Sequence, residues 1–399
     1  MNKKICVMGL GYIGLPTAAL LANRGYKIHG VDVVQSTIDT INRGEIHIVE
    51  PDLDTFVKSA VNSGNLKADS TPESADVFII AVPTPFHEGY VPNIDYVVAA
   101  SQAIAPYVKE GNIIILESTS PVGTTEKVEE VLKQEGIDTS TIYVAHCPER
   151  VLPGCIMREL VENDRIVGGT TPEATVKTVE FYRTFVKGEV LATDAKTAEM
   201  AKLTENSFRD TNIAFANELS ILCDEFEINV WELIALANRH PRVNILQPGA
   251  GVGGHCIAVD PWFIVHAGGE KAKMIRTARE INTYKTEWAI EKIKNQALEF
   301  EKEHGRMAKV ACMGLAFKPD IDDLRESPAL YITRRLIAEK LEVMPVEPNI
   351  ASFDEFKVFG YMEAIEKADI IVYLVKHKEF KTVNIGQDKK IIDFCGVDK

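Results

Sequence analysis

Short apolar runs alternate with amphipathic stretches through the first half of the chain, a pattern typical of β-α-β units and a parallel sheet. The predicted strands are Ile5–Met8, Lys27–Val31, Val77–Ala81, Ile113–Glu117, Ile142–Ala145 and Arg165–Val167. Sheet-like segments continue to about Val190. The pattern predicts a first α/β domain over residues 1–195.

A helical region follows this domain. Residues 196–238 contain hardly a helix breaker and place apolar residues at helical spacing, which predicts one long helix or two with a break near residues 227–229. A loop rich in Pro and Gly covers residues 241–261, and residues 271–304 have the pattern of another long amphipathic helix. Long helices between two α/β units often form a spine with a dimer interface. We therefore expect residues 196–304 to be a dimerisation region and the protein to be a homodimer.

A second α/β pattern begins at Lys309. Its predicted elements are strands Lys309–Met313, Leu341–Val346, Ile370–Leu374 and Lys390–Asp393, with helices at Ser327–Lys340 and near Glu363–Lys367. The fold class expected is thus α/β, with an N-terminal nucleotide-binding domain, a central helical spine and a smaller α/β domain over residues 305–399.

Composition narrows the partners and the compartment. The 399 residues carry a formal net charge of -14, which at long range repels nucleic acid and anionic membranes. The seven cysteines are scattered without a C-x-x-C pair, so we expect neither a disulfide framework nor a metal site. The start lacks the features of a signal peptide and no apolar run is long enough to span a bilayer, so we expect a cytoplasmic protein with no membrane partner.

A glycine-rich turn after the first strand indicates a dinucleotide site. The spacing G-x-G-x-x-G opens a helix, and an acid stands at the end of the next strand. The glycines allow a tight turn, approach of a pyrophosphate and close helix packing, while the acid would bind ribose hydroxyls and repel a 2′-phosphate. This context predicts a Rossmann-type domain that prefers NAD over NADP. The expected cofactor contacts are Gly9, Gly11, Tyr12, Ile13, Gly14 and Asp32.

Two further loops follow strands, where ligands of open parallel sheets bind. They are Val82–Pro85 and Glu117–Thr124, and they add Pro83, Thr84 and Thr119 to the expected cofactor contacts. Taken alone, Pro and Thr at a strand end are ordinary turn residues. A third loop offers Glu149 as a base, although a lone Glu on a loop is normally a solvated charge.

Lys202 and Asn206 stand four residues apart on one helix face. Such a pair is most often an exposed surface pair. Beside a substrate alcohol it would instead supply two donors to a developing alkoxide.

The segment from Gly249 to Pro261 carries the strongest chemical signal. Four glycines between positions 249 and 254 precede Cys256, and Asp260 follows it. Glycine brings backbone close to a ligand and leaves a thiol accessible, and a helix N-terminus or a cation would make that thiol a nucleophile. Cysteine is more commonly a small buried hydrophobe, but the flanking glycines and Asp260 disfavour that interpretation here.

The last motif lies between a strand and a helix of the second α/β region. Lys318 and Arg325 supply cations at a position suited to phosphate. Ser327 and Pro328 then form a helix start.

With these motifs in this order the sequence resembles the UDP-glucose/GDP-mannose dehydrogenase family over essentially its whole length. The matching texts are G-L-G-Y-I-G, V-P-T-P, S-T-S-P-V-G-T-T, C-P-E-R, A-E-M-x-K-x-x-x-N, the cysteine loop and G-L-A-F-K-P-D. The resemblance implies a UDP-binding C-terminal domain and NAD as cofactor. It also implies an enzyme that oxidises a UDP-sugar alcohol to an acid in a four-electron reaction, through a thiohemiacetal and a thioester.

The resemblance also implies a role for each site residue. Cys256 is the nucleophile, Lys202 and Asn206 stabilise the oxyanion, and Asp260 is an acid or base near the thiol. Glu149 and Thr119 position the hydrolytic water, and Arg325 lies near the cofactor or the domain interface. Arg242 falls about where the family uses an arginine of the neighbouring subunit. The substrate contacts expected are Glu149, Arg150, Val151, Lys202, Asn206, Arg242, Asn244, Gly253 and Lys318.

The cysteine loop resembles the branch of the family that acts on N-acetylated sugars. Val252 and Val259 stand where UDP-glucose members typically carry Phe and Lys, and the Ala258 and Trp262 text is similar to the N-acetylmannosamine branch. The same chemistry on UDP-N-acetylglucosamine or UDP-glucose is the alternative. A nucleotide-sugar sensor and a two-electron dehydrogenase are more distant ones. His255 either helps to hold the thiolate or simply packs.

Overall fold

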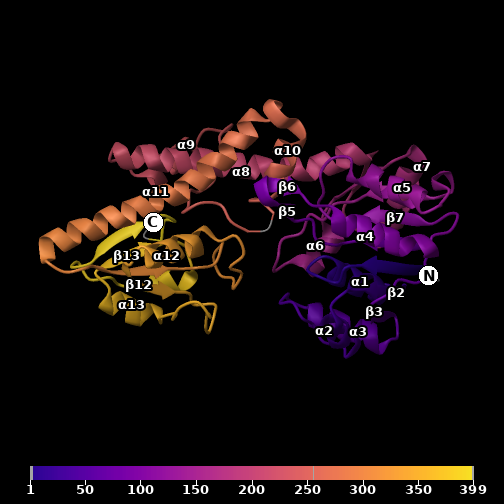
Figure 1. The fold of residues 1–399 in the computed structure, drawn as a ribbon, viewed down its shortest axis with the longest axis horizontal. Coiled ribbons are helices and arrows are strands. Elements are labelled where there is room, and N and C mark those ends of the chain that lie inside the picture. The colour runs from indigo at the N-terminus through magenta and orange to yellow at the C-terminus, as the bar shows by residue number, and fades with distance from the viewer. Residues whose placement is uncertain (1–2, 255, 398–399) are drawn as a thin grey trace. The chain divides into compact units, whose positions relative to one another are not determined.

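The computed structural model describes residues 3–254 and 256–397. The chain forms two compact units, Met1–Thr204 (unit 1) and Glu205–Lys399 (unit 2) (Figure 1). None of the helices among the described residues has both the length and the apolar character needed to cross a membrane.

Unit 1 is an α/β domain. Its strands are β1 Lys4–Met8, β2 Lys27–Val31, β3 Leu66–Asp69, β4 Val77–Ile80, β5 Phe86–His87, β6 Val91–Pro92, β7 Ile113–Leu116, β8 Tyr143–His146, β9 Arg165–Gly169 and β10 Val190–Asp194. Its helices are α1 Gly14–Asn23, α2 Gln35–Asn42, α3 Leu53–Asn62, α4 Asp95–Ile104, α5 Thr124–Gln134, α6 Ile156–Glu162 and α7 Pro172–Tyr182. Helix α8, Ala195–Glu225, begins in unit 1 and continues into unit 2.

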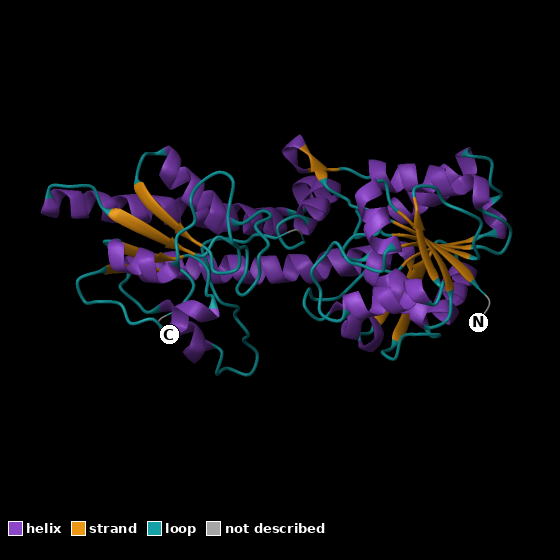
Figure 2. Cartoon of the chain, turned by 90° about the horizontal axis from the view of Figure 1, so that it is seen from below, coloured by secondary structure: helices purple, strands orange, loops and turns teal. Residues whose placement is uncertain are grey.

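The large sheet of unit 1 has eight strands in the order β10-β9-β8-β7-β4-β1-β2-β3, and Figure 2 shows helices on both sides of its twisted strands. Six of them, from β8 to β3, run parallel, as the alternating pattern predicts. The expectation of a parallel sheet is wrong at β9, which pairs with β8 in the antiparallel sense, while β10 runs parallel to β9. A parallel strand needs a crossover to the opposite edge of the sheet. The segment with α6 provides none, so β9 starts at the edge where β8 ends.

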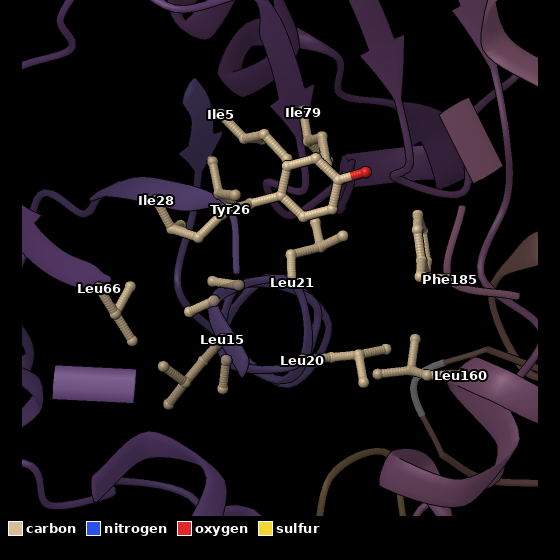
Figure 3. Close-up of a cluster of buried hydrophobic side chains, with 14 of the residues drawn as sticks. Ile5, Leu15, Leu20, Leu21, Tyr26, Ile28, Leu66, Ile79, Leu160 and Phe185 are labelled. Carbon is tan, nitrogen blue, oxygen red and sulfur yellow. The ribbon is translucent and has the colours of Figure 1, made fainter. Parts of the chain in front are cut away.

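Buried apolar side chains between the sheet and α1 hold unit 1 together. In Figure 3 the ring of Tyr26 lies against Ile5, Ile79 and Leu21, and these side chains are at most 1% exposed. The Tyr26 hydroxyl donates to Thr184 Oγ1 over 2.7 Å, so burial of the ring leaves no polar atom unpaired. This core fixes α1 and therefore the glycine-rich turn that precedes it.

Unit 2 combines helices with a second sheet. Its helices are the rest of α8, α9 Val230–Ala237, α10 Asp260–Gly268, α11 Lys273–His304, α12 Pro328–Ala338 and α13 Tyr361–Lys367. Its strands are β11 Lys309–Met313, β12 Glu342–Val346, β13 Ile370–Tyr373 and β14 Lys390–Asp393, all parallel in the order β12-β11-β13-β14. The predicted α/β class with a separate C-terminal sheet is confirmed.

Two details of the helical region bear on the site. The break between α8 and α9 falls at residues 226–229, as predicted, and the Asn229 side chain caps α9. The predicted loop over residues 241–261 ends two residues earlier, at Val259, because Asp260 and Pro261 start the unpredicted helix α10. Proline is favoured in the first turn of a helix, where its missing N–H has no partner to lose.

A buried ion pair joins α8 to α11 within unit 2. Arg279 Nη1 donates to Asp210 Oδ1 over 2.6 Å, and Asn282 Nδ2 donates to the same oxygen over 2.8 Å. About two helical turns further along α8, Asn217 Nδ2 donates to Asn282 Oδ1. The Asn217 Oδ1 accepts a hydrogen bond from the Gly249 N–H. The two helices therefore also anchor the start of the cysteine loop.

Candidate active site

The glycine-rich turn of unit 1 has the geometry of a dinucleotide site. Gly9 has φ +90°, and a Cβ there would lie 2.6 Å from the Ala81 carbonyl oxygen. A Cβ on Gly14 would overlap the Gly9 carbonyl, whereas one on Gly11 would meet nothing within 4 Å. Gly9 and Gly14 thus serve the turn and the packing of α1, and Gly11 leaves space where a pyrophosphate would approach.

Asp32 is tied to this turn. Its Oδ2 accepts a hydrogen bond from the Leu10 N–H over 3.0 Å, and its Oδ1 accepts from the Val34 N–H over 2.9 Å. The carboxylate is half-buried at the end of β2. Both hydrogen bonds hold the Asp32 carboxylate beside the glycine-rich turn. The turn and Asp32 therefore fit a dinucleotide whose ribose hydroxyls donate to this carboxylate. Ile13 is half-buried beside the turn and Tyr12 is exposed.

The two strand-end loops expected beside the cofactor touch each other. Thr84 Oγ1 donates to the Thr119 carbonyl over 2.6 Å, and Ser118 Oγ donates to the Val82 carbonyl over 2.7 Å. Thr119 is half-buried and Pro83 is exposed. The Thr84 hydroxyl therefore has a structural bond, which fixes the loop that carries Thr119.

Glu149 is a buried, paired carboxylate rather than a solvated one. It is 6% exposed, and its Oε2 accepts from Arg165 Nη1 over 2.6 Å. Its Oε1 accepts from the Arg150 N–H over 2.7 Å. Strands β8 and β9 pair in the antiparallel sense, with Ala145 opposite Gly169. If this register is extended by four residues beyond Ala145, Glu149 lies opposite Arg165. The strand direction that the sequence did not predict is therefore what forms this pair.

Glu117 is a functional candidate that the sequence analysis missed. It directly follows β7 and is 1% exposed, with Thr17 Oγ1 at 3.3 Å and the Tyr182 hydroxyl at 3.4 Å. Burial, together with the like charge of Glu149, raises the pKa of Glu117 to about 8. An acid at the end of an apolar strand, Ile113–Leu116, was the signal in the sequence that could have marked it.

In unit 2, Cys256 lies four residues before α10, in the turn that leads into this helix. Its carbonyl accepts from the Asp260 N–H over 2.8 Å and from the Val259 N–H over 3.0 Å, so a helical turn joins it to α10. The Cys256 residue is exposed, as predicted from the glycines. A helix N-terminus favours negative charge and so favours a thiolate at this position. His255 lies outside the described residues.

Asp260 and Asn206 form a pair beside this turn. Asn206 Nδ2 donates to Asp260 Oδ2 over 2.5 Å, and the two residues are 4% and 3% exposed. The Asp260 N–H donates to the Cys256 carbonyl, so this hydrogen bond connects the pair to the cysteine turn. Lys202, also on α8 and half-buried, precedes Asn206 by about one turn. The exposed surface pair that an i,i+4 spacing usually means is thus excluded for Asn206.

The glycines of the cysteine loop serve packing inside unit 2. Gly254 has φ +85°, and a Cβ there would lie 2.7 Å from the Phe317 ring. A Cβ on Gly253 would overlap the Glu326 carbonyl and lie 2.6 Å from Pro328 Cδ. The loop is therefore pressed against the segment between β11 and α12. The sequence predicts that these glycines let a ligand approach the backbone, and the structure adds that Gly253 and Gly254 are also needed for packing.

The remaining predicted substrate residues of unit 2 differ in their surroundings. Lys318 is half-buried, with Nζ 5.9 Å from the centroid of the Phe317 ring. Arg325 forms a two-pronged ion pair with Asp323, with N–O distances of 2.6 to 3.1 Å. Arg242 and Asn244 are exposed on the loop before Gly249, which α8 holds through Asn212.

The remaining predicted substrate residues of unit 1 follow Glu149. Arg150 is half-buried and its Nη1 donates to the Asp164 carbonyl over 3.0 Å. Val151 packs on the large core of unit 1.

A grouping of possible metal ligands occurs in unit 2. Ligand atoms of Asp320, His377 and Glu379 lie within 4.8 Å of one another, among the residues that the structure describes. His377 Nδ1 accepts from the Asp320 N–H over 3.0 Å, and Nε2 lies 3.1 Å from Glu347 Oε2. Both ring nitrogens are engaged in these hydrogen bonds, so the imidazole serves the packing of this domain.

The fold and these sites define the class of protein. The chain has a dinucleotide-binding turn with an acid placed to bind ribose hydroxyls, and it has an exposed cysteine in the turn before a helix. These features are typical of a dinucleotide-dependent dehydrogenase that uses a thiol. Family comparison agrees. Residues 3–186 match the NAD binding domain of the UDP-glucose/GDP-mannose dehydrogenase family, residues 196–284 its central domain and residues 311–397 its UDP binding domain. The chain belongs to this family, and its cofactor is NAD.

Several relatives resemble the chain over nearly its full length. It is 56% identical to a UDP-N-acetyl-D-mannosamine dehydrogenase of Campylobacter jejuni, and the match covers 99% of this chain and 100% of the relative. It is 53% identical to an NDP-N-acetyl-D-galactosaminuronic acid dehydrogenase of Ralstonia solanacearum, covering 99% and 96%. A solved UDP-D-ManNAc dehydrogenase from Pyrococcus horikoshii superposes with a TM-score of 0.90 at 40% identity, covering 99% and 96% of the two chains.

Proposed function

We propose that this protein oxidises UDP-N-acetyl-D-mannosamine at C6 to the uronate, with two molecules of NAD per sugar. The observation that carries the proposal is the exposed Cys256 in the turn before α10, hydrogen-bonded to the Asp260 N–H, with Asp260 itself in the buried Asn206–Asp260 pair. A thiol nucleophile can hold an aldehyde covalently between two oxidations. The 56% identical relative named for this substrate supports the choice of sugar.

The first oxidation uses charged and polar donors of α8. Bound NAD supplies the acceptor for the hydride in each of the two oxidations. Lys202 and Asn206 stabilise the negative charge that develops on the C6 oxygen. Asp260, held by Asn206, serves as the acid or base near that oxygen and near the thiol. Removal of one proton and one hydride from the alcohol gives the aldehyde.

The second oxidation takes place on the cysteine. The Cys256 thiolate adds to the aldehyde carbon, and the resulting oxyanion takes up a proton to give a thiohemiacetal. Loss of that proton and of a second hydride gives a thioester. Water then cleaves the C–S bond, which releases the acid and restores the thiol. Glu149 and Thr119 position this water, and Arg165 holds Glu149 in one direction.

The sugar preference depends on the cysteine loop. Val252 and Val259 offer less volume than Phe and Lys and no charge, which leaves room for a C2 acetamido group. Arg242 and Asn244 are candidates for its carbonyl, and Lys318 is a candidate for the diphosphate. Because the 53% identical relative is named for a galacto sugar, the test panel includes UDP-N-acetyl-D-galactosamine beside the gluco epimer and UDP-glucose. Higher kcat/KM on any of these than on the manno sugar would overturn the substrate assignment.

The decisive experiment replaces the nucleophile. Wild type is expected to form two NADH per sugar, and Cys256→Ser to form no acid while still binding the UDP-sugar, because serine is a far weaker nucleophile. Cys155→Ser is the matched control, since this half-buried residue precedes α6 in unit 1 and serine is a good helix cap. One NADH per sugar in the wild type, or acid formation by Cys256→Ser, would exclude the thioester route.

We also propose that the protein is a homodimer through its helical region. Phe208, Phe215 and Leu222 recur at seven-residue spacing on α8, and Phe226 follows directly after its last residue. Their exposed fractions are 66%, 53%, 43% and 64%. An exposed apolar stripe on a long helix is suited to a second copy of the same stripe. Phe215→Glu is expected to give a monomer in sedimentation, and Arg209→Glu, an exposed control on the same helix, to leave the dimer intact.

We assign a separate role to each of the three regions of the chain. Residues 1–195 bind NAD, residues 196–304 contain the dimerisation helices and the cysteine loop, and residues 305–399 bind the UDP moiety. Arg242 completes the site of the neighbouring copy. We place the enzyme in the cytoplasm, the compartment that its sequence predicts. Full activity of a dilute monomer would contradict the dimer and the shared arginine together.

A further inference from the structure

A cluster of buried polar side chains surrounds the catalytic candidate Glu149 in unit 1. Five structural elements contribute to it: α1, the ends of β7 and β8, the start of β9 and the end of α7. Its members are almost inaccessible to solvent: Thr17 at 2%, Glu117 at 1%, Glu149 at 6%, Arg165 at 1% and Tyr182 at 1% exposed. Charge inside such a cluster must be balanced by its own members, because water does not reach it.

The cluster holds two carboxyl groups and one guanidinium. Arg165 Nη1 donates to Glu149 over 2.6 Å, and its Nη2 donates to the Leu160 carbonyl over 3.2 Å. The charge of Arg165 also lowers the pKa of Glu117, but this effect is smaller than the opposite effect of burial. Two buried carboxylates beside one cation would leave a net negative charge out of water, so one carboxyl group keeps its proton.

Hydrogen bonds decide which of the two it is. Glu149 receives a charged donor and the Arg150 N–H, both of which stabilise a carboxylate. Glu117 has only two hydroxyl neighbours, Thr17 at 3.3 Å and Tyr182 at 3.4 Å. Both hydroxyls donate to Glu117, but they are uncharged and their bonds are long, so they stabilise its ionised form far less than Arg165 stabilises ionised Glu149. The proton belongs on Glu117.

The other titratable groups of the cluster do not compete for this role. Burial raises the pKa of the Cys147 thiol to about 12 and raises the pKa of Tyr182 well above its usual value. Both groups therefore stay neutral over the range in which Glu117, with its pKa raised to about 8, gives up its proton.

We propose that Glu117 is a positioning residue for Glu149: it stays the neutral acid, so that the whole charge of Arg165 holds Glu149 as an oriented carboxylate. This inference rests on the proposed function, in which Glu149 directs the water that cleaves the thioester. When Glu117 ionises, a second negative charge competes for Arg165, and the bond that fixes Glu149 weakens. Hydrolysis of the thioester then slows on the alkaline side.

The first test reads the proton directly and needs no turnover. The infrared C=O band of a protonated carboxylic acid is expected in the wild type at pH 7, to fade as pH rises through about 8, and to be missing in Glu117→Gln. Glu162→Gln, an exposed change on α6, is the control and should keep the band. Absence of the band in the wild type at pH 7, or its persistence in Glu117→Gln, would overturn the proposal.

The second test follows kcat against pH under saturating substrates. Glu117→Gln keeps the shape and neutrality of the acid, so activity at pH 7 should stay within about threefold of the wild type, and the alkaline decline attributable to Glu117 should disappear. An unchanged alkaline limb in this variant would overturn the proposal. Because KM reports sugar binding, a change in KM alone with kcat and its pH profile intact would count against it too.

Tyr182→Phe gives a second, gentler variant should Glu117→Gln fold poorly. It removes one hydroxyl that stabilises ionised Glu117 while keeping a buried ring in place. The infrared transition and the alkaline limb should both move to higher pH, whereas a merely structural role of Glu117 would move neither. If the wild type oxidises none of the UDP-sugars, the proposed function fails, and the infrared titration still decides the state of Glu117.

Discussion

The side-chain amide of Asn206 donates a hydrogen bond to the Asp260 carboxylate over 2.5 Å, with both side chains buried in unit 2. Asp260 also starts α10, and its N–H binds the Cys256 carbonyl. One residue of α8 therefore positions the acid that follows the nucleophile. The same amide is proposed to stabilise the oxyanion, which gives it two separable effects.

Asn206→Ala is expected to lower kcat/KM by about 100- to 1000-fold, the usual cost of removing one donor to a developing oxyanion. It should also lower the free energy of unfolding by about 1 to 3 kcal/mol, because the buried Asp260 carboxylate loses the hydrogen bond from Asn206. Steady-state kinetics and urea unfolding measure the two effects. Arg209→Ala, an exposed change on the same helix, should alter neither. A loss of activity below about tenfold would contradict the oxyanion role.

Asp32→Asn is expected to raise kcat/KM with NADP relative to NAD, since the charge that repels a 2′-phosphate is removed. Asparagine keeps an oxygen that can accept from the Leu10 N–H, so the turn should remain formed. The ratio of kcat/KM for the two cofactors is the measurement. Asp39→Asn, an exposed carboxylate on α2, is the control. Equal use of both cofactors by the wild type would defeat the assignment of Asp32.

Gly254→Ala is expected to reduce both stability and activity. Its φ of +85° disfavours any side chain, and the added Cβ would press into the Phe317 ring at 2.7 Å. The combined strain should cost about 1 to 3 kcal/mol, and displacement of the loop should lower kcat. Gly249→Ala is the matched control, because its Cβ meets its nearest neighbour at 3.6 Å. Thermal unfolding and kinetics of the pair measure the difference, and equal behaviour of the two variants would refute the packing role.

Lys285→Met is expected to affect stability in a pH-dependent way. Lys285 is buried, its Nζ donates to Ser220 over 2.7 Å and lies 3.8 Å from the Trp288 ring centroid. Burial lowers its pKa from 10.5 to about 7, with smaller and opposed effects of Asp224 and Lys292. Between these values the unfolded chain binds the proton more strongly, so the stability of the wild type rises with pH and is lost as pH falls toward 7.

Since methionine does not titrate, the gain in Tm of Lys285→Met over the wild type should be largest near pH 7 and should shrink toward about pH 10. Thermal unfolding at the two pH values measures this. Lys302→Met, an exposed change on the same helix, should show no such trend. A constant difference between Lys285→Met and the wild type would mean that Lys285 keeps its ordinary pKa in the folded protein.

The local elements could be predicted because their signals are local. Strands Lys309–Met313 and Lys390–Asp393 follow from short apolar runs, and the break after α8 follows from the Asn229 cap. The glycine turn with Asp32 is equally local, since strand, turn, helix and acid succeed one another along the chain. The family comparison confirms the NAD-binding domain that this turn predicts.

Partners distant in sequence could not be predicted in this way. Arg165 reaches Glu149 because β9 runs antiparallel to β8, and the direction of a strand depends on its connection rather than on its own residues. Had β9 been parallel, as the alternating pattern predicts, Arg165 would start at the opposite edge of the sheet. Glu149 would then be the solvated loop charge that its sequence context alone favours.

Thus the sequence by itself determined most of the strands and long helices, the cofactor turn and the accessible cysteine, because each depends on residues that are neighbours along the chain, whereas β3 and α10 were not predicted. Only the tertiary structure decided which carboxyl group carries a proton and which faces a cation. That outcome depends on burial and on the number of charges enclosed with Glu117, and both quantities exist only once β7, β8, β9 and α7 have packed together.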